Sequence, residues 1–257
     1  METPFEIRYN NIKLQVERLY KSADQTIKQH FPGLEDISFT LRGGECVHLH
    51  SYVPSANRLL LDTLSGHFRI DAGAIWVDHQ RQWLNLSQLS QRQTGEIQAR
   101  TIGHLGCSET LRTQSIVMDC VSKPFLNLGL SRVQAEGQSR HVLDWVGLPR
   151  RLWHQAPKHL TLAELHQVNL ARTFAIDYSV IVIDVPINHL DRDNQRRLIQ
   201  LIEYRKAQNT CFIGSFNDDD LRQQICDRNL SIHVPTPIFS GPAPTHAAAS
   251  NIAAHSY

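Results

Sequence analysis

The sequence predicts an α/β fold in which helices cover a parallel sheet and a β-rich layer comes first in the chain. The unbroken β-branched run at residues 180–183 ends in Asp184, which is typical of a buried parallel strand that presents a carboxylate at its end. Residues 163–176 place apolar side chains at helical spacing just before it. A helix that leads into a buried strand is half of an α/β unit.

The first third of the chain predicts strands around one strand–loop–helix unit. Residues 12–16 and 37–41 have strand-like patterns, and residues 45–50 form a third predicted strand after the turn at Gly43 and Gly44. Helical spacing of apolar residues resumes at 59–65, and residues 73–77 resemble a further strand.

The rest of the chain predicts helices and then short strands. Residues 108–150 have two helix-like segments separated by Gly129, which favours a mainly helical insertion. A helix at 193–207 and strands at 210–216 and 229–234 are expected after Asp184. Residues 235–257 are rich in Pro, Ala, Ser and His, so we expect a disordered tail.

Length, composition and charge define a globular chain without an obvious charged partner. The 257 residues are 41% hydrophobic and can bury a substantial core. The 26 basic residues nearly balance the 25 acidic ones, which gives no field that favours nucleic acid or an anionic membrane. The 14 histidines make the charge sensitive to mild acid.

Cysteine usage and the amino terminus indicate a cytoplasmic protein. The five cysteines are odd in number and widely scattered, which favours reduced thiols over a disulfide framework or a zinc site. The first residues lack a basic and then apolar signal pattern, and no apolar stretch is long enough to span a bilayer. We therefore expect no direct membrane insertion.

Several motifs together resemble a bacterial ATP-binding-cassette (ABC) ATPase. GGECVHLH, RRLWHQAP, VNLARTFAIDY, VIVIDVP and HLD occur in the order and spacing of that family, over roughly residues 12–234. The stretch 151–178 is most similar to the PhnL-type component of phosphonate carbon–phosphorus lyase systems. The resemblance implies a P-loop NTPase core over residues 1–234, with an antiparallel β layer and a helical subdomain at about 108–172. It also implies ATP and Mg²⁺ as cofactors.

The resemblance places the phosphate loop at residues 51–58, where the family pattern is G-x-x-x-x-G-K-[ST]. The glycines of this pattern let backbone N–H groups wrap the phosphates, the lysine reaches the outer phosphates and the hydroxyl binds magnesium. Here Ser51 and Ala56 replace the glycines, Asn57 replaces the lysine and Arg58 replaces the hydroxyl residue. Ser55 lies within the loop, and Pro54 removes one donor N–H.

The other catalytic positions implied by the resemblance also depart from the family pattern. Cys107 stands at the magnesium-bridging glutamine, Val185 at the glutamate that polarises water, and Asn217 at the histidine that contacts the γ-phosphate. Neither Val185 nor Asn217 can act as a general base. The signature motif S-G-G-x-Q falls on residues 161–165, Thr161-Leu162-Ala163-Glu164-Leu165, with Leu162 where close backbone approach needs glycine.

Three family positions keep their residue type, and each has a structural alternative. Asp184 stands at the magnesium carboxylate, but the structural alternative, a cap or hydrogen bond to the turn before Pro186, is favoured without a phosphate loop. Asp191 of the interface loop could be an ordinary N-cap. Tyr20, at the adenine-stacking position, could be a packing residue.

Other clusters favour structural roles. His48, His50 and His154 have no metal-ligand spacing, and we interpret them as satisfied or exposed histidines. The run of three aspartates at 218–220 is typical of a helix start, where carboxylates lie at the positive end of the dipole.

The leading hypothesis is a pseudo-ATPase that serves as a binding or regulatory subunit, because the phosphate loop, signature and catalytic positions are all altered together. Its partners would be another cassette, in a homodimer or heterodimer, or phosphonate lyase proteins. The alternative is an ATP-hydrolysing subunit of a lyase or transporter assembly. A third possibility is a small-anion site formed by Arg58 and Ser55.

Overall fold

The computed structural model describes residues 11–23, 32–107, 111–112, 115–184, 191–216 and 218–234. The expected tail at 235–257 lies outside these residues, as do Val185 and Asn217. The residue limits expected for the domain and its helical part stay predictions.

Four strands form an antiparallel sheet in the order β2-β1-β4-β5. They are β1 (Ile12–Lys21), β2 (Leu34–Arg42), β4 (Ala72–His79) and β5 (Gln82–Asn85). In β1, Leu14, Val16 and Leu19 are buried, whereas Glu17 and Arg18 are exposed. One face of this sheet is therefore part of the core, as the alternation of an antiparallel sheet allows.

Five strands form a parallel sheet in the order β6-β7-β8-β3-β9. They are β3 (Cys46–His50), β6 (Ile102–Leu105), β7 (Val180–Ile183), β8 (Cys211–Gly214) and β9 (Arg228–Ser231). The register pairs Leu105 with Ile183, so β6 and β7 end side by side. The predicted α/β fold class is confirmed.

The apolar run of β7 divides its side chains between two cores. Val180 and Val182 belong to the cluster formed with α2 (Pro54–Leu64) and the antiparallel sheet. Ile181 and Ile183 belong to the cluster formed with the helices on the opposite face. Because successive side chains of a strand point to opposite faces, a strand buried on both faces needs apolar residues throughout.

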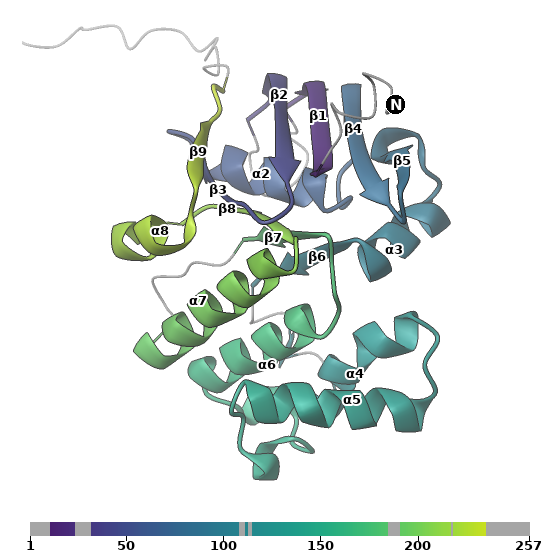
Figure 1. The fold of residues 1–257 in the computed structure, drawn as a ribbon, viewed down its shortest axis with the longest axis vertical. Helices are drawn as coiled ribbons and strands as arrows, with labels where there is room; N and C mark the ends of the chain where they lie inside the picture. Colours follow the sequence, from purple (N-terminus) through teal and green to yellow (C-terminus); the bar gives the residue numbers. More distant parts are fainter. Residues whose placement is uncertain are drawn as a thin grey trace, which may run out of the picture.

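The two sheets and the helices form layers (Figure 1). α2 lies between the two sheets, while α4 to α7 cover the other face of the parallel sheet. The helices are α3 (Gln91–Arg100), α4 (Val117–Asn127), α5 (Arg132–Trp145), α6 (Leu162–Phe174), α7 (Arg192–Ala207) and α8 (Asp219–Ile225). Short 3₁₀ turns lie at η1 (Leu86–Gln88), η3 (Arg150–Leu152) and η4 (Pro157–His159).

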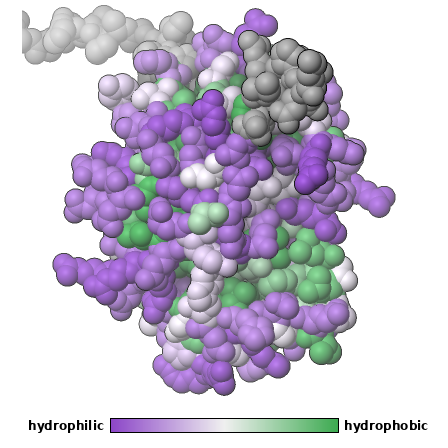
Figure 2. All heavy atoms as spheres, viewed as in Figure 1, coloured by the Kyte–Doolittle hydropathy of each residue, from purple (hydrophilic) through white to green (hydrophobic). Residues whose placement is uncertain are grey.

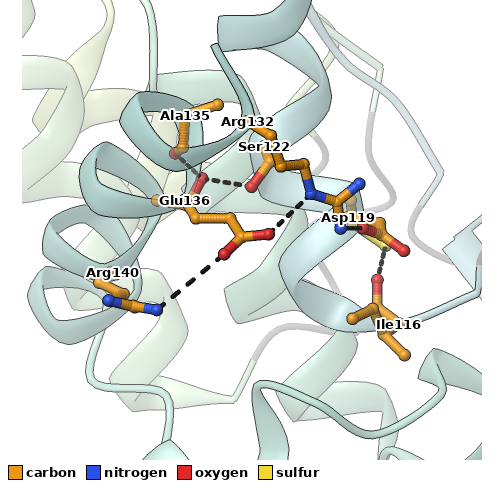
Figure 3. A network of polar contacts seen from close by, with 9 residues as sticks. Ile116, Asp119, Ser122, Arg132, Ala135, Glu136 and Arg140 are labelled. Carbon is orange, nitrogen blue, oxygen red and sulfur yellow. Dashed lines mark hydrogen bonds and ion pairs between the residues drawn. The ribbon is translucent and has the colours of Figure 1, made fainter.

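Polar contacts fasten α4 to α5 (Figure 3). The guanidinium of Arg132 donates to Asp119 Oδ1 at 2.6 Å and to Glu136 Oε1 at 2.7 Å. Deeper in the interface, the hydroxyls of Ser122 and Ser139 lie 2.9 Å apart and are fully buried. This pair satisfies two polar groups where an unpaired hydroxyl would be costly.

Apolar side chains reach the surface at the end of the helical layer where α4 meets α5 (Figure 2). Leu126 and Val133 are the exposed large apolar residues of that end. Within the described residues, no helix is both long and apolar enough to cross a membrane.

Several element limits differ from the sequence predictions. β1 continues to Lys21 instead of stopping at residue 16, and β8 ends at Gly214 instead of residue 216. α2 begins at Pro54, five residues before the expected helical segment, because proline is well suited to the first helical turn. β5, α3 and β6 were not predicted.

Candidate functional site

The turn between β3 and α2 has few backbone donors available for an anion. The Val53 N–H donates to Ser51 Oγ at 3.1 Å, and the Ala56 N–H donates to the Val53 carbonyl at 2.9 Å. Pro54, the first residue of the helix, has no N–H. Two of the amides expected to wrap phosphate are therefore already used inside the turn.

The helix also starts too early for the expected loop. Residues 54–58 are the first turn and a half of α2, and not a loop that could curve around a phosphate chain. Residues 51–53 are therefore a three-residue turn that leads directly into the helix, and the nucleotide-binding role expected for residues 51–58 stays a prediction. The physical reason for the short turn is that no residue of this segment is glycine, whose freedom an anion-wrapping backbone requires.

Asn57, at the expected lysine position, points toward the end of β8. It is buried, and its Nδ2 donates to Ser215 Oγ at 3.2 Å. Its buried Oδ1 accepts no hydrogen bond from the described residues. A short amide held here carries no charge for an outer phosphate.

Arg58 forms ion pairs with two carboxylates from different elements. Its Nε lies 3.7 Å from Asp62 Oδ2, one helical turn further along α2. The same Nε lies 3.7 Å from Oδ2 of Asp184, which follows β7. Burial raises the pKa of Asp184, and the positive charge of Arg58 acts in the opposite direction.

These residues do not fit a magnesium ion. Magnesium takes oxygen ligands at about 2.0–2.1 Å in near-octahedral geometry. Arg58 supplies only donors where the family pattern has a hydroxyl ligand, and its cation already neutralises Asp184. No step of a mechanism is therefore assigned to magnesium here.

Two cavities flank Arg58 and Asp184. One, of about 620 Å³, is also lined by Asp62, His67 and His104. The other, of about 610 Å³, is also lined by His48, Ser55 and Asn57. Cys107, which stands two residues after β6, lines both cavities and has an exposed side chain.

His48 is a buried core histidine next to the second cavity. Its Nδ1 accepts the Phe216 N–H at 3.3 Å. Burial, followed by the nearby charges of Arg222 and His50, lowers the pKa of His48 to about 4. The ring is therefore neutral at pH 7, which agrees with its interpretation as a satisfied histidine. The exposed His50 ring contacts Tyr52 edge-on.

The signature position forms an N-terminal helix cap. The Thr161 Oγ accepts the Glu164 N–H at 3.3 Å, and Glu164 Oε2 accepts the Thr161 N–H at 2.9 Å. This reciprocal pair is a capping box at the start of α6. Leu162 follows as a partly exposed apolar side chain where the family pattern has glycine.

The remaining predicted residues lie apart from Arg58 and Asp184. Asp191 caps α7, since its Oδ1 accepts the Asn194 N–H at 2.8 Å. Tyr20 is an exposed residue of β1 and lines neither of the two cavities. Asp218 caps α8 through the Leu221 N–H, so the three aspartates begin a helix as predicted.

Sequence reasoning did not single out Asp62, His67 and His104, although they lie next to the predicted residues. The only available signal was the i, i+4 spacing of Arg58 and Asp62 on a helix. His104 comes from β6, which has no clear sequence pattern, and only the fold brings it to α2.

A strand–turn–helix unit at the carboxyl ends of a parallel sheet, with a carboxylate after a strand that lies two positions away in the same sheet, defines the class of P-loop-like α/β proteins. The solved dimer of the ATP-binding cassette MJ0796 with ADP and Pi has this fold, with a TM-score of 0.74 over 85% of this chain and 94% of that one, at 16% identity. No protein-family model matches the chain.

Sequence relatives place the chain in a protein family within this class. It is 30% identical over 200 residues to the lipoprotein-releasing system ATP-binding protein LolD of Koribacter versatilis, covering 77% of this chain and 86% of that protein. It is 24% identical to the energy-coupling factor transporter ATP-binding protein EcfA2 of Lactobacillus gasseri, over 82% and 75% of the two chains. The chain belongs to the ATP-binding-cassette family.

Proposed function

We propose that this chain is an ABC protein that does not hydrolyse ATP and that acts as a binding or regulatory subunit. The observation that carries the proposal is the ion pair between Arg58 and Asp184. This ion pair brings a guanidinium to the carboxylate that would otherwise hold magnesium. Phosphoryl transfer depends on a magnesium ion and on positioned hydrogen-bond donors, which stabilise the charge of the transition state. Loss of both removes most of this stabilisation.

The turn before α2 supports the same proposal independently. The Val53 and Ala56 amides are engaged within the turn, and Pro54 has none. An incoming polyphosphate would therefore have to break internal hydrogen bonds before it gained new ones. Asn57 adds no compensating charge.

Partners are proposed from the family. LolD and EcfA2 are named as ATP-binding proteins of a lipoprotein-releasing system and of a transporter. We infer a cytoplasmic partner surface for another cassette or for a membrane component of such a system. A role in phosphonate metabolism is a narrower form of this proposal and depends on the sequence likeness at residues 151–178.

The competing function is an ATP-hydrolysing subunit, which the names of the relatives favour. In a head-to-tail pair of cassettes, one chain's phosphate loop meets the other chain's signature. This chain has a closed turn at the first position and Leu162 at the second, so it would weaken both composite sites. That argues against the usual rescue by an active partner.

Measurement of phosphate release tests the proposal. The untagged protein, alone and with magnesium-ATP, should release phosphate no faster than buffer does. The matched control is Asp184→Asn, which removes the one acidic residue that a magnesium-dependent reaction would need. Turnover that the control abolishes would overturn the proposal, whereas turnover that the control retains would identify a contaminating enzyme.

A further inference from the structure

Three potential metal ligands from separate parts of the chain converge at the wall of the larger cavity. They are a carboxylate oxygen of Asp62 on α2, an imidazole nitrogen of His67 just after α2, and an imidazole nitrogen of His104 on β6. One ligand atom from each lies within 4.8 Å of the other two. All three residues line the cavity.

The backbone holds His67 over Asp62. The chain reverses after α2 at Gly66, whose φ of +76° is readily adopted by glycine. The His67 N–H then donates to the Asp62 carbonyl at 2.9 Å, as in a helix C-cap. The His67 Nδ1 consequently lies 3.7 Å from Asp62 Oδ1.

The third residue, His104, contributes a buried ring nitrogen, Nε2, that makes no hydrogen bond to the described residues. The His104 ring lies 5.1 Å from the His67 ring, centroid to centroid. A buried polar atom of this kind needs an explanation, and an ion bound at the adjoining cavity would provide one.

We propose that Asp62, His67 and His104 bind a divalent transition-metal ion, zinc in the first instance, with an open coordination position toward the cavity. Two imidazoles and one carboxylate are a ligand set that zinc accepts, and catalytic or ligand-binding zinc sites keep such an open position. A hard ion such as magnesium, which prefers oxygen ligands, does not suit two imidazoles.

Small movements complete the proposed site. Ligand atoms around a tetrahedral zinc ion lie about 3.3–3.5 Å apart, given metal–ligand distances of about 2.0–2.2 Å. The present separations, up to 4.8 Å, must therefore shorten by up to about 1.4 Å. His67 can supply this movement because its side chain is 46% exposed, while His104 on strand β6 and Asp62 on helix α2 are only partly exposed and stay in place.

Arg58 and the ion can occupy opposite sides of the same carboxylate. Arg58 pairs with Oδ2 of Asp62, whereas Oδ1 faces His67. The proposed zinc site is therefore separate from the Arg58–Asp184 pair and does not depend on whether nucleotide binds. It would place a Lewis acid in a cavity that Lys123 and Arg172 also line.

Zinc affinity tests the proposal. Untagged protein, first stripped with a chelator, is titrated with Zn²⁺ against a chromophoric zinc chelator that reports the free ion. We expect one site per chain. The variants His67→Ala, Asp62→Asn and His104→Asn should each lower the affinity at least tenfold, since even loss of an outer-shell partner costs about 10–100-fold.

Matched controls separate this site from other histidines and thiols. His141→Ala changes an exposed histidine of α5 and should leave the affinity unchanged. Cys107→Ser changes a residue that lines the same cavity but is outside the proposed ligand set, so it should also leave the affinity nearly unchanged. If His104→Asn does not fold, the zinc affinity of His67→Ala still tests the proposal. The proposal would be overturned if the protein took up no zinc. It would also be overturned if His67→Ala left zinc uptake intact, or if only Cys107→Ser removed it.

Discussion

The Nε of Arg58 on α2 lies 3.7 Å from Oδ2 of Asp184, the residue that follows strand β7. The two residues are 126 positions apart and meet because α2 packs between the two sheets while β7 ends at its side. One cation thus links the helix to the sheet at the position where the sequence resemblance predicts a magnesium ligand. Asp62 shares the same guanidinium.

Arg58→Met should destabilise the fold by about 1 kcal/mol. Each ion pair of a half-exposed arginine contributes about 0.2–1 kcal/mol, and removal also takes the shared cation away from two partly buried carboxylates. Urea unfolding at pH 7 measures the change. Arg196→Met is the matched control, because Arg196 and Asp193 form an exposed pair on α7, and it should cost less than about 0.5 kcal/mol. Equal costs for both variants would refute a linking role for Arg58.

His48 should make the protein less stable in mild acid. Its folded pKa of about 4 lies below the ordinary value of 6.5, so the unfolded chain takes up a proton first as the pH falls. Stability is complete above pH 6.5 and decreases down to about pH 4, by about 2 kcal/mol at pH 5. Asp219 opposes the shift that burial, Arg222 and His50 produce.

The variant His48→Asn isolates this contribution. Its side-chain oxygen can still accept the Phe216 N–H, but it does not titrate. Unfolding free energies at pH 7 and pH 5 should differ by about 2 kcal/mol less in His48→Asn than in the unchanged protein. The exposed His141→Asn should retain the original pH dependence. A variant as acid-sensitive as the unchanged chain would show that another group is responsible.

Thr161 should act as a helix cap. We expect Thr161→Ala to cost about 1 kcal/mol of unfolding free energy, the usual value for loss of an N-cap. Ser131→Ala is the matched control, because Ser131 and Gln134 form the same capping box on α5. We expect Thr161→Ala and Ser131→Ala to lose similar amounts of stability, measured by thermal unfolding. A loss of partner binding with no loss of stability would instead support a signature role for Thr161.

Gly103 should tolerate no side chain. A Cβ at this position of β6 would lie 2.5 Å from Cδ2 of the Tyr178 ring, which is too close for real atoms. Gly103→Ala should therefore destabilise by about 1–3 kcal/mol through overpacking. Gly137→Ala on α5 has open space around it and should stabilise by about 0.5–1 kcal/mol. Denaturant unfolding of both variants checks the opposite signs.

The strongest sequence signals predicted their elements closely. The β-branched run at 180–183 is β7 residue for residue, and the helix expected at 163–176 is α6 within two residues. Both are buried, so hydrophobic pattern and structure agree. α3 was missed because only Ile97 of its ten residues is buried, which leaves no apolar periodicity to detect.

The candidate site was less predictable than the fold. Losses of glycine, lysine and hydroxyl were visible in residues 51–58, but the early start of α2 was not. The contacts of Arg58 with Asp184, and of His104 with His67, join residues far apart in the chain. Such pairs depend on tertiary packing, which the local spacing of residues along the sequence does not predict.

Calorimetric titration with magnesium-ATP tests the central claim most directly. A LolD protein in the same buffer serves as positive control, and the Asn57→Lys, Arg58→Ser double variant as internal comparison. If Arg58 and the closed turn before α2 have replaced the phosphate and magnesium site, the unchanged protein gives no saturable heat at concentrations where LolD does. Saturable binding by the unchanged protein would contradict the account.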